Sequence, residues 1–225
     1  MDPFRLASLY QELNQQVVTA GDRSQTYLVP RENPLDQSAR TFAAIEFACL
    51  DIIGKTVGKP VCDVIGGRVR DEVPFSAYLF YKHGGGGGLG DDRREDEYGE
   101  VLDPQAAVRE ARQMIDRYGF REIKLKGGVL PPETDRRCAK NSVPLNRLRI
   151  GPNCAWSVET SVRVGQNLHK ELSGGGYHED PCPQLLGMAE VRRRLITEDN
   201  RTPLASNVAV TNFADVPRAH ALDAV

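Results

Sequence analysis

Two lysines separated by a single residue are the clearest candidates for chemistry in this sequence. Lys124 and Lys126 lie in the run Ile-Lys-Leu-Lys-Gly-Gly, whose apolar residues favour a β-strand that ends at the glycines. Residues i and i+2 of a strand face the same side, so two ammonium groups would meet there. Burial and a second positive charge both lower a lysine pKa, so one of the pair could act as a general base near neutral pH. The alternative is an edge strand with a solvated lysine face.

Oxygen-bearing side chains follow two later strand candidates. Glu179 begins the run Glu-Asp-Pro, and Asn207 follows the short segment 203–206. Carboxylate and amide oxygens are ligands that Mg²⁺ accepts, and the ion could neutralise the enediolate formed when a lysine removes a proton beside a carboxylate. Taken alone, Glu-Asp-Pro is also typical of a turn and Asn207 of a helix cap.

The segments around these residues alternate between predicted strands and predicted helices. The positions Lys126, Gly151, Glu179 and Asn207 each end a strand candidate, at intervals of 25, 28 and 28 residues. This alternation predicts a parallel α/β sheet or barrel, in which chemistry is usual at the strand C-termini. The predicted strands are 73–80, 121–126, 147–150, 177–179 and 203–206, and the predicted helices are 103–118, 157–172, 187–196 and a segment from 213 onward.

Other segments give weaker or different signals. Residues 131–145 are polar and contain Pro144, so we expect a poor helix there. His83 to Glu100 contains five consecutive glycines and predicts a flexible loop. Nearer the N-terminus, apolar spacing predicts helices at 6–18, 41–54 and 61–65, with Gly54 ending the second.

Composition excludes several classes of protein. The 225 residues carry 29 Lys and Arg against 31 Asp and Glu, and the net charge of −2 argues against a dedicated nucleic-acid binder. No apolar run approaches the roughly 18 residues of a membrane span. The five cysteines are scattered without a Cys-x-x-Cys pair, so neither a disulfide framework nor a zinc site is supported. Without a visible secretory signal, a cytoplasmic location is expected.

Several runs of residues, in their order and spacing, resemble one known family. They resemble the enolase superfamily of the mandelate racemase and muconate lactonizing enzyme type, and within it the glucarate dehydratase branch. The resemblance extends from about Ala43 to the C-terminus. The runs that carry it are Ala43 to Lys55, Pro60-Val61, Ile65 to Gly67, Tyr78 to Phe80, Lys124 to Leu130, Pro152 to Ser157 and Glu179 to Cys182.

The resemblance implies a fold and a reaction. The fold is a partial TIM-type (β/α) barrel of about five βα units, residues 71–225, preceded by a helical remnant of an α+β capping domain, residues 1–70. The reaction is Mg²⁺-dependent proton abstraction α to a carboxylate, followed by β-elimination of water from an aldarate such as glucarate, which makes the family member a carbon–oxygen lyase. Lysine with Mg²⁺ is a pattern of this superfamily.

Roles carry over to matching positions of this chain. Lys126 would abstract the proton, and Lys124 would support the substrate carboxylate. Glu179 and Asn207 would be metal ligands. The substrate contacts implied by the resemblance are Tyr78 and Asn153. The expected partner is thus a small aldarate, with no nucleic acid and no membrane, and family members often form homo-oligomers.

The sequence also departs from the family. Gly151 stands where the family has an aspartate that is the first metal ligand, so we expect Mg²⁺ binding to be weakened or lost. The family's later His-Asp pair has no counterpart in these 225 residues, and residues 135–146 do not resemble the second barrel helix. Turnover is therefore expected to be impaired. The alternatives are a catalytically dead fragment or pseudoenzyme, and a module that completes a partner's barrel.

Overall fold

The computed structural model describes residues 2–20, 34–85, 91, 94–142, 147–210 and 213–225. The chain divides into two compact units, Met1–Val73 and Pro74–Val225. Much of the glycine-rich segment predicted as a loop, residues 86–90 and 92–93, lies outside the described residues. None of the helices that are described combines the length and hydrophobicity that a membrane crossing requires.

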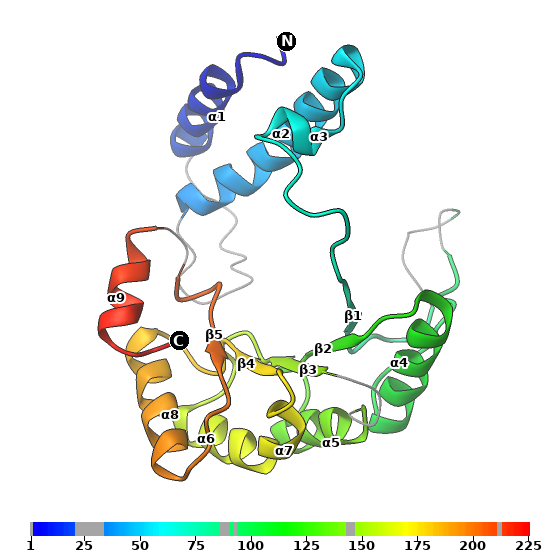
Figure 1. Cartoon of the computed structure of the whole chain (residues 1–225), viewed down its shortest axis with the longest axis vertical. Helices are drawn as coiled ribbons and strands as arrows, with labels where there is room; N and C mark the ends of the chain where they lie inside the picture. Colours follow the sequence, from blue (N-terminus) through cyan, green and yellow to red (C-terminus); the bar gives the residue numbers. More distant parts are fainter. Residues whose placement is uncertain (1, 21–33, 86–90, 92–93, 143–146, 211–212) are drawn as a thin grey trace. The chain divides into compact units, whose positions relative to one another are not determined.

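In its described part, the first unit consists of helices α1 (Leu6–Ala20), α2 (Pro34–Val57) and α3 (Val61–Val64) (Figure 1). Tyr10 of α1 meets Phe42 of α2 edge to face, with ring centroids 5.0 Å apart. The prediction that Gly54 ends the second helix is wrong, because α2 continues for three more residues. A side chain at Gly54 would lie 2.7 Å from the Lys59 carbonyl oxygen, so this glycine instead lets the following turn fold back onto the helix.

The second unit is built on a five-stranded parallel sheet, which confirms the predicted α/β architecture. The strands follow one another in the order β1-β2-β3-β4-β5, and each pairs in parallel with the next. The strands are β1 (Ser76–Leu79), β2 (Glu122–Lys126), β3 (Arg147–Gly151), β4 (Tyr177–Glu179) and β5 (Leu204–Ala205). The helices are α4 (Pro104–Tyr118), α5 (Pro132–Ser142), α6 (Val158–Asn167), α7 (His169–Leu172), α8 (Leu185–Thr197) and α9 (Asp215–Ala221).

The two faces of this sheet differ in chemistry. Ile123 and Leu125 of β2, like Leu148 and Ile150 of β3, are buried in the core that α4, α5 and α7 help to cover (Figure 1). Because side chains alternate along a strand, the intervening residues face the opposite side. We call that side the lysine face, and its residues are Ser76, Tyr78, Glu122, Lys124, Lys126, Arg147, Arg149, Gly151, Tyr177 and Glu179.

Two helices of this unit differ from the sequence expectation. Residues 132–142 form α5, so the predictions of a poor helix there and of no second barrel helix are wrong. Asp135, Cys138 and Ala139 have no exposed surface, and this buried stripe stabilises a helix whose composition is otherwise polar. The predicted helix 157–172 is divided at Leu168 into α6 and α7. Asp103 caps the N-terminus of α4, since its carboxylate accepts the Ala106 N–H at 2.9 Å.

Candidate active site at the strand ends

Lys124 forms a largely buried ion pair with Glu179. The register places Lys124 on β2 opposite Arg149 on β3, and Glu179 ends the following strand. The Lys124 Nζ lies 2.7 Å from Glu179 Oε1 and 2.6 Å from Oε2. Only 17% of the lysine side chain and 8% of the glutamate side chain are exposed. The pair therefore links two strands that are not neighbours, across β3.

This ion pair reverses one expectation about Lys124. Burial does lower the lysine pKa, but the hydrogen bond and the negative charge of Glu179 outweigh it, and the pKa of Lys124 is raised above its ordinary value. The expectation of two mutually repelling ammonium groups with a lowered pKa is therefore wrong for this residue. A lysine held in its charged form suits the support of a substrate carboxylate, not proton abstraction.

Lys126 has a different kind of partner. Its Nζ donates a hydrogen bond to Asn153 Oδ1 at 2.8 Å. Asn153 lies in the loop after β3 and adopts a positive φ of 56°, a conformation that asparagine tolerates better than most residues. The next residue, Cys154, donates its N–H to the Asp180 carbonyl oxygen at 2.7 Å, which fastens this loop to the loop after β4. The predicted base and the predicted substrate-binding amide are thus brought together.

Tyr78 lies beside the lysines on the first strand. Its register partner is Lys124, and the ammonium nitrogen lies 5.0 Å from the centre of the tyrosine ring. The Phe80 ring lies 4.3 Å from the Tyr78 ring, centroid to centroid. A cation near an aromatic ring is attracted by its π-electrons, so Tyr78 helps to hold Lys124 in place. The predicted substrate contact of Tyr78 remains a prediction.

The residues predicted to bind Mg²⁺ do not form a matching set of ligands. Gly151 offers no side-chain oxygen, and both oxygens of Glu179 already contact Lys124. In the described part of the chain, no group of three His, Cys, Asp or Glu side chains is arranged to hold a metal ion. Magnesium prefers several oxygen ligands with near-octahedral geometry. The residues present therefore do not fit this ion.

Asn207 is held at the strand end by its backbone. Its N–H donates to Asp180 Oδ2 at 3.2 Å, while its side chain is exposed. Asp180 also accepts the Ser206 hydroxyl at 2.6 Å and the Val208 N–H at 3.3 Å. Among the described residues, the structure records no side-chain bond from Asn207 to either lysine. The Asp180 carboxylate therefore holds the loop after β5 in place.

A buried cluster behind Lys126 was missed by sequence reasoning. Asp135 of α5 accepts the Gly128 N–H at 2.7 Å and the Tyr81 hydroxyl at 2.7 Å. Gly128 has a φ of 85°, and a side chain there would lie 2.3 Å from the Pro152 carbonyl oxygen. This close approach joins the loop after Lys126 to the loop that carries Asn153. The adjacent glycines were the available signal, whereas the partner Asp135 lay in a segment that composition argued against.

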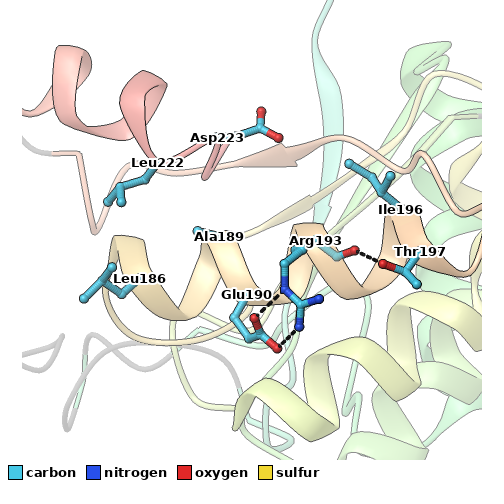
Figure 2. Close-up of a pocket in the computed structure, with 8 residues that line it drawn as sticks. All are labelled: Leu186, Ala189, Glu190, Arg193, Ile196, Thr197, Leu222 and Asp223. Atoms are coloured by element: carbon cyan, nitrogen blue, oxygen red, sulfur yellow. Dashed lines mark hydrogen bonds and ion pairs between the residues drawn. The ribbon is translucent and has the colours of Figure 1, made fainter.

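A separate groove lies on the outer surface of α8. Its volume is about 440 Å³, and Figure 2 shows Leu186 and Ala189 on the helix with Leu222 and Asp223 of the segment after α9. Arg193 is bound by Glu190 through two hydrogen bonds of 2.9 and 2.7 Å, so its charge is already paired. The groove contains none of the residues that sequence reasoning selected. The strand ends thus remain the candidate site.

Comparison with known proteins agrees with this geometry. The family described as "Enolase C-terminal domain-like" matches residues 106–225, which is more than half of the chain. The chain belongs to the enolase superfamily. Within this superfamily, it is 42% identical over 186 residues to a Streptomyces coelicolor protein named "Probable glucarate dehydratase", a match that covers 81% of the chain and 41% of that protein. It is also 32% identical to a chloromuconate cycloisomerase from Cupriavidus pinatubonensis, over 68% of the chain and 37% of that protein.

Solved structures of the superfamily share the fold of the whole chain. An enolase from Pseudomonas fluorescens Pf0-1, crystallised with magnesium, potassium and tartrate, is 39% identical, with a TM-score of 0.81 over 100% of this chain and 52% of its own. A Gibberella zeae enolase complexed with magnesium, formate and sulfate has 39% identity and a TM-score of 0.77, over 100% of this chain and 50% of its own. The chain thus spans about half the length of the relatives it matches. Because the similar proteins include one named as a probable glucarate dehydratase, several cycloisomerases and a racemase, superfamily membership does not fix the reaction.

Proposed function

We propose that the protein is an acid-sugar dehydratase-like member of the enolase superfamily whose turnover is impaired. Its substrate is an aldarate such as glucarate. Its reaction is a β-elimination of water, which makes it a carbon–oxygen lyase. The observation that carries this proposal is the pairing of Lys126 with Asn153 at 2.8 Å, beside Lys124, at the ends of adjacent parallel strands. The similarity to a protein named as a glucarate dehydratase supports the aldarate class.

In this reaction the chain's own residues act on a carboxylate and its neighbouring carbon. Lys126 takes the proton from the carbon α to the carboxylate. Hydroxide leaves the β-carbon and takes a proton from solvent to become water, Lys126 returns its own proton to solvent, and the enol product tautomerises to a 2-keto-3-deoxy acid. Negative charge builds on the carboxylate as the proton leaves, so Lys124 stabilises it best while it stays charged, which its raised pKa favours.

The proposed impairment of turnover follows from the missing metal ligand at Gly151. Aldarate dehydration in the family is expected to need Mg²⁺, and Gly151 has no side-chain oxygen to offer as a ligand. Even substitutions outside the direct ligands of a metal typically cost about 10- to 100-fold in affinity or activity, so an absent ligand should cost at least as much. A Cβ atom at Gly151 would meet Glu179 atoms at 3.5 to 3.7 Å, which is ordinary contact, so the backbone leaves room for a side chain to start there.

The test is product formation from glucarate with Mg²⁺, detected as the 2-keto-3-deoxy acid. The purified chain should give little or no product, Gly151→Asp should give measurably more, and Gly151→Asp with Lys126→Met should give none. Product formation that survives Lys126→Met would contradict the role of Lys126. Rapid turnover by the unmodified chain would contradict the impairment.

The second candidate function is non-catalytic, either a pseudoenzyme or a module that completes a partner's barrel. The observation that favours it is the Lys124–Glu179 pair, which satisfies the charge of the one acidic metal-ligand candidate. Under this alternative, Gly151→Asp would leave the chain without any product. The barrel-completing form would additionally co-purify with a protein that carries the later strands of a related barrel.

A further inference from the structure

We propose that the strand-end site binds the carboxylate of its ligand directly on Lys126, without a divalent cation, and that Lys124 takes the place of that cation beside Glu179. This inference rests on the proposed acid-sugar ligand and deepens it: a Lys126 ammonium that holds the carboxylate cannot at the same time accept the α-proton, so this complex agrees with the proposed impairment of turnover. Its starting point is the mismatch between the residues at these strand ends and the ligands that Mg²⁺ prefers.

The negative charge of Glu179 is already paired with the Lys124 ammonium of the same chain. Both carboxylate oxygens lie within 2.7 Å of the Lys124 ammonium, and both side chains are largely buried. A divalent cation that approached Glu179 would have to displace this ammonium and leave it buried without a carboxylate. Breaking such a pair is strongly unfavourable, because an unpaired charge in a partly desolvated place costs several kcal/mol. The internal cation therefore competes with an external one for Glu179.

The other carboxylate on the lysine face is satisfied in the same way. Glu122 pairs with Arg149 and lies 3.6 Å from Arg147, and it also accepts the Ser76 hydroxyl at 3.1 Å. Arg149 in turn lies over the Tyr177 ring, 5.0 Å from its centre. The lysine face carries four cations and two carboxylates. Both carboxylates form ion pairs with cations other than Lys126.

Lys126 is therefore the cation of this face whose described partner is a neutral amide. Asn153 uses one of three ammonium hydrogens, which leaves two donors for a ligand. The face as a whole carries an excess of two positive charges, which favours an anion over a cation. Gly151, the register partner of Lys126, adds neither bulk nor negative charge beside it. A carboxylate can thus approach Lys126 from the position that a metal-ligating aspartate would otherwise occupy.

The experiment measures glucarate binding to the purified chain by calorimetry, once with EDTA and once with excess Mg²⁺. Glucitol, which has the same carbon number but no carboxylate, is the ligand control. Lys126→Met should weaken binding about 10- to 100-fold, as expected for the loss of a charged hydrogen bond. Lys126→Arg should retain binding within several-fold, and the exposed helix residue Lys170→Met should leave it unchanged.

Two results support the inference and two overturn it. The first supporting result is a glucarate affinity that is equal within about twofold in EDTA and in Mg²⁺. The second comes from Gly151→Asp, which should bind Mn²⁺ more tightly than the parent chain does and should bind glucarate less tightly in EDTA. Binding that needs Mg²⁺ would overturn the inference while leaving the proposed function intact. No glucarate binding in either condition, by a chain that unfolds cooperatively on heating, would overturn both.

Discussion

The strand-end site has a lysine side, with Lys124 and Lys126, and a metal side, with Gly151 and Asn207, and the two differ in their contacts. On the lysine side, Lys124 and Lys126 each have a defined partner within 2.8 Å, and the loops beside these partners, after β3 and β4, are joined by the bond from the Cys154 N–H to the Asp180 carbonyl. On the metal side, Gly151 has no side chain and the Asn207 side chain is exposed. The contacts on the lysine side, which include the pair of Lys124 with the metal-ligand candidate Glu179, also stabilise the fold, whereas Gly151 and Asn207 contribute to it through their backbones. The two sides can therefore change independently.

The largest effect should come from disturbing the packing behind the lysine side. Gly128→Ala combines a positive φ of 85° with a clash of 2.3 Å against Pro152, so we expect a loss of about 2–5 kcal/mol in the free energy of unfolding. Gly119→Ala is the matched control, because its φ is 69° and nothing lies within 4 Å of the added methyl group. It should cost only about 1–2 kcal/mol. Urea unfolding measures both, and equal losses would refute the claim of close packing.

The next prediction concerns the ion pair that distinguishes the two sides. Glu179→Gln keeps the shape of the side chain but leaves the Lys124 charge buried without a carboxylate, and should cost about 2–4 kcal/mol of stability. Lys124→Met combined with Glu179→Gln should cost less than Glu179→Gln alone, because no buried charge remains. The exposed pair of Lys55 and Asp51 is the comparison, and Asp51→Asn should cost about 0.5 kcal/mol or less. Additive effects of the two site substitutions would contradict a coupled pair.

A third prediction compares the two faces of β4, where His178 lies next to Glu179. His178 is fully buried, contacts Trp156 edge to face at 5.4 Å, and has a pKa lowered to about 3 by burial. The unfolded chain binds this proton near pH 6.5, and the folded chain does not until much lower pH. The contribution of neutral His178 to the free energy of unfolding should therefore be fully present above pH 6.5. Below pH 6.5 the free energy of unfolding should fall by about 1.4 kcal/mol per pH unit.

Thermal unfolding between pH 7 and pH 4 tests this prediction for His178. His178→Phe retains an aromatic ring beside Trp156 and removes the titrating group, so the acid loss should be shallower by about 1.4 kcal/mol per pH unit. The parent chain and the variant should differ little in pH dependence above pH 7. An unchanged slope below pH 6 in the variant would show that the acid sensitivity comes from other groups.

The approximate positions of the strands and the shared face of the lysines could be predicted from the sequence, because both follow from local periodicity. The alternation of apolar and charged residues in Glu122 to Lys126 is a pattern of period two, and it needs no distant partner. Helix α5 could not be predicted, because its stability depends on burying Asp135, Cys138 and Ala139. Burial of an aspartate becomes favourable only once Gly128 and Tyr81 arrive from other parts of the chain.

The electrostatics of the site were beyond sequence reasoning for a similar reason. Adjacent lysines suggested mutual repulsion and a lowered pKa, whereas the pKa of Lys124 is raised by Glu179, 55 residues away. The sign of the shift depends on which charge comes closest, and that is decided by the fold. Gly151 shows the converse case, since the absence of a side chain was evident from the sequence before any contact was known.

The smallest expected effect compares the two asparagines, one on each side of the site. Asn207→Ala removes an exposed side chain and keeps the backbone N–H that binds Asp180, so the free energy of unfolding should change by less than about 0.5 kcal/mol. Asn153→Ala removes the acceptor of Lys126 and should weaken glucarate binding in EDTA by more than Asn207→Ala does. Calorimetry on the two variants decides the matter. If Asn207→Ala weakened metal-free binding as much as Asn153→Ala, the ligand would be using the metal side as well, and the separation of the two sides would be wrong.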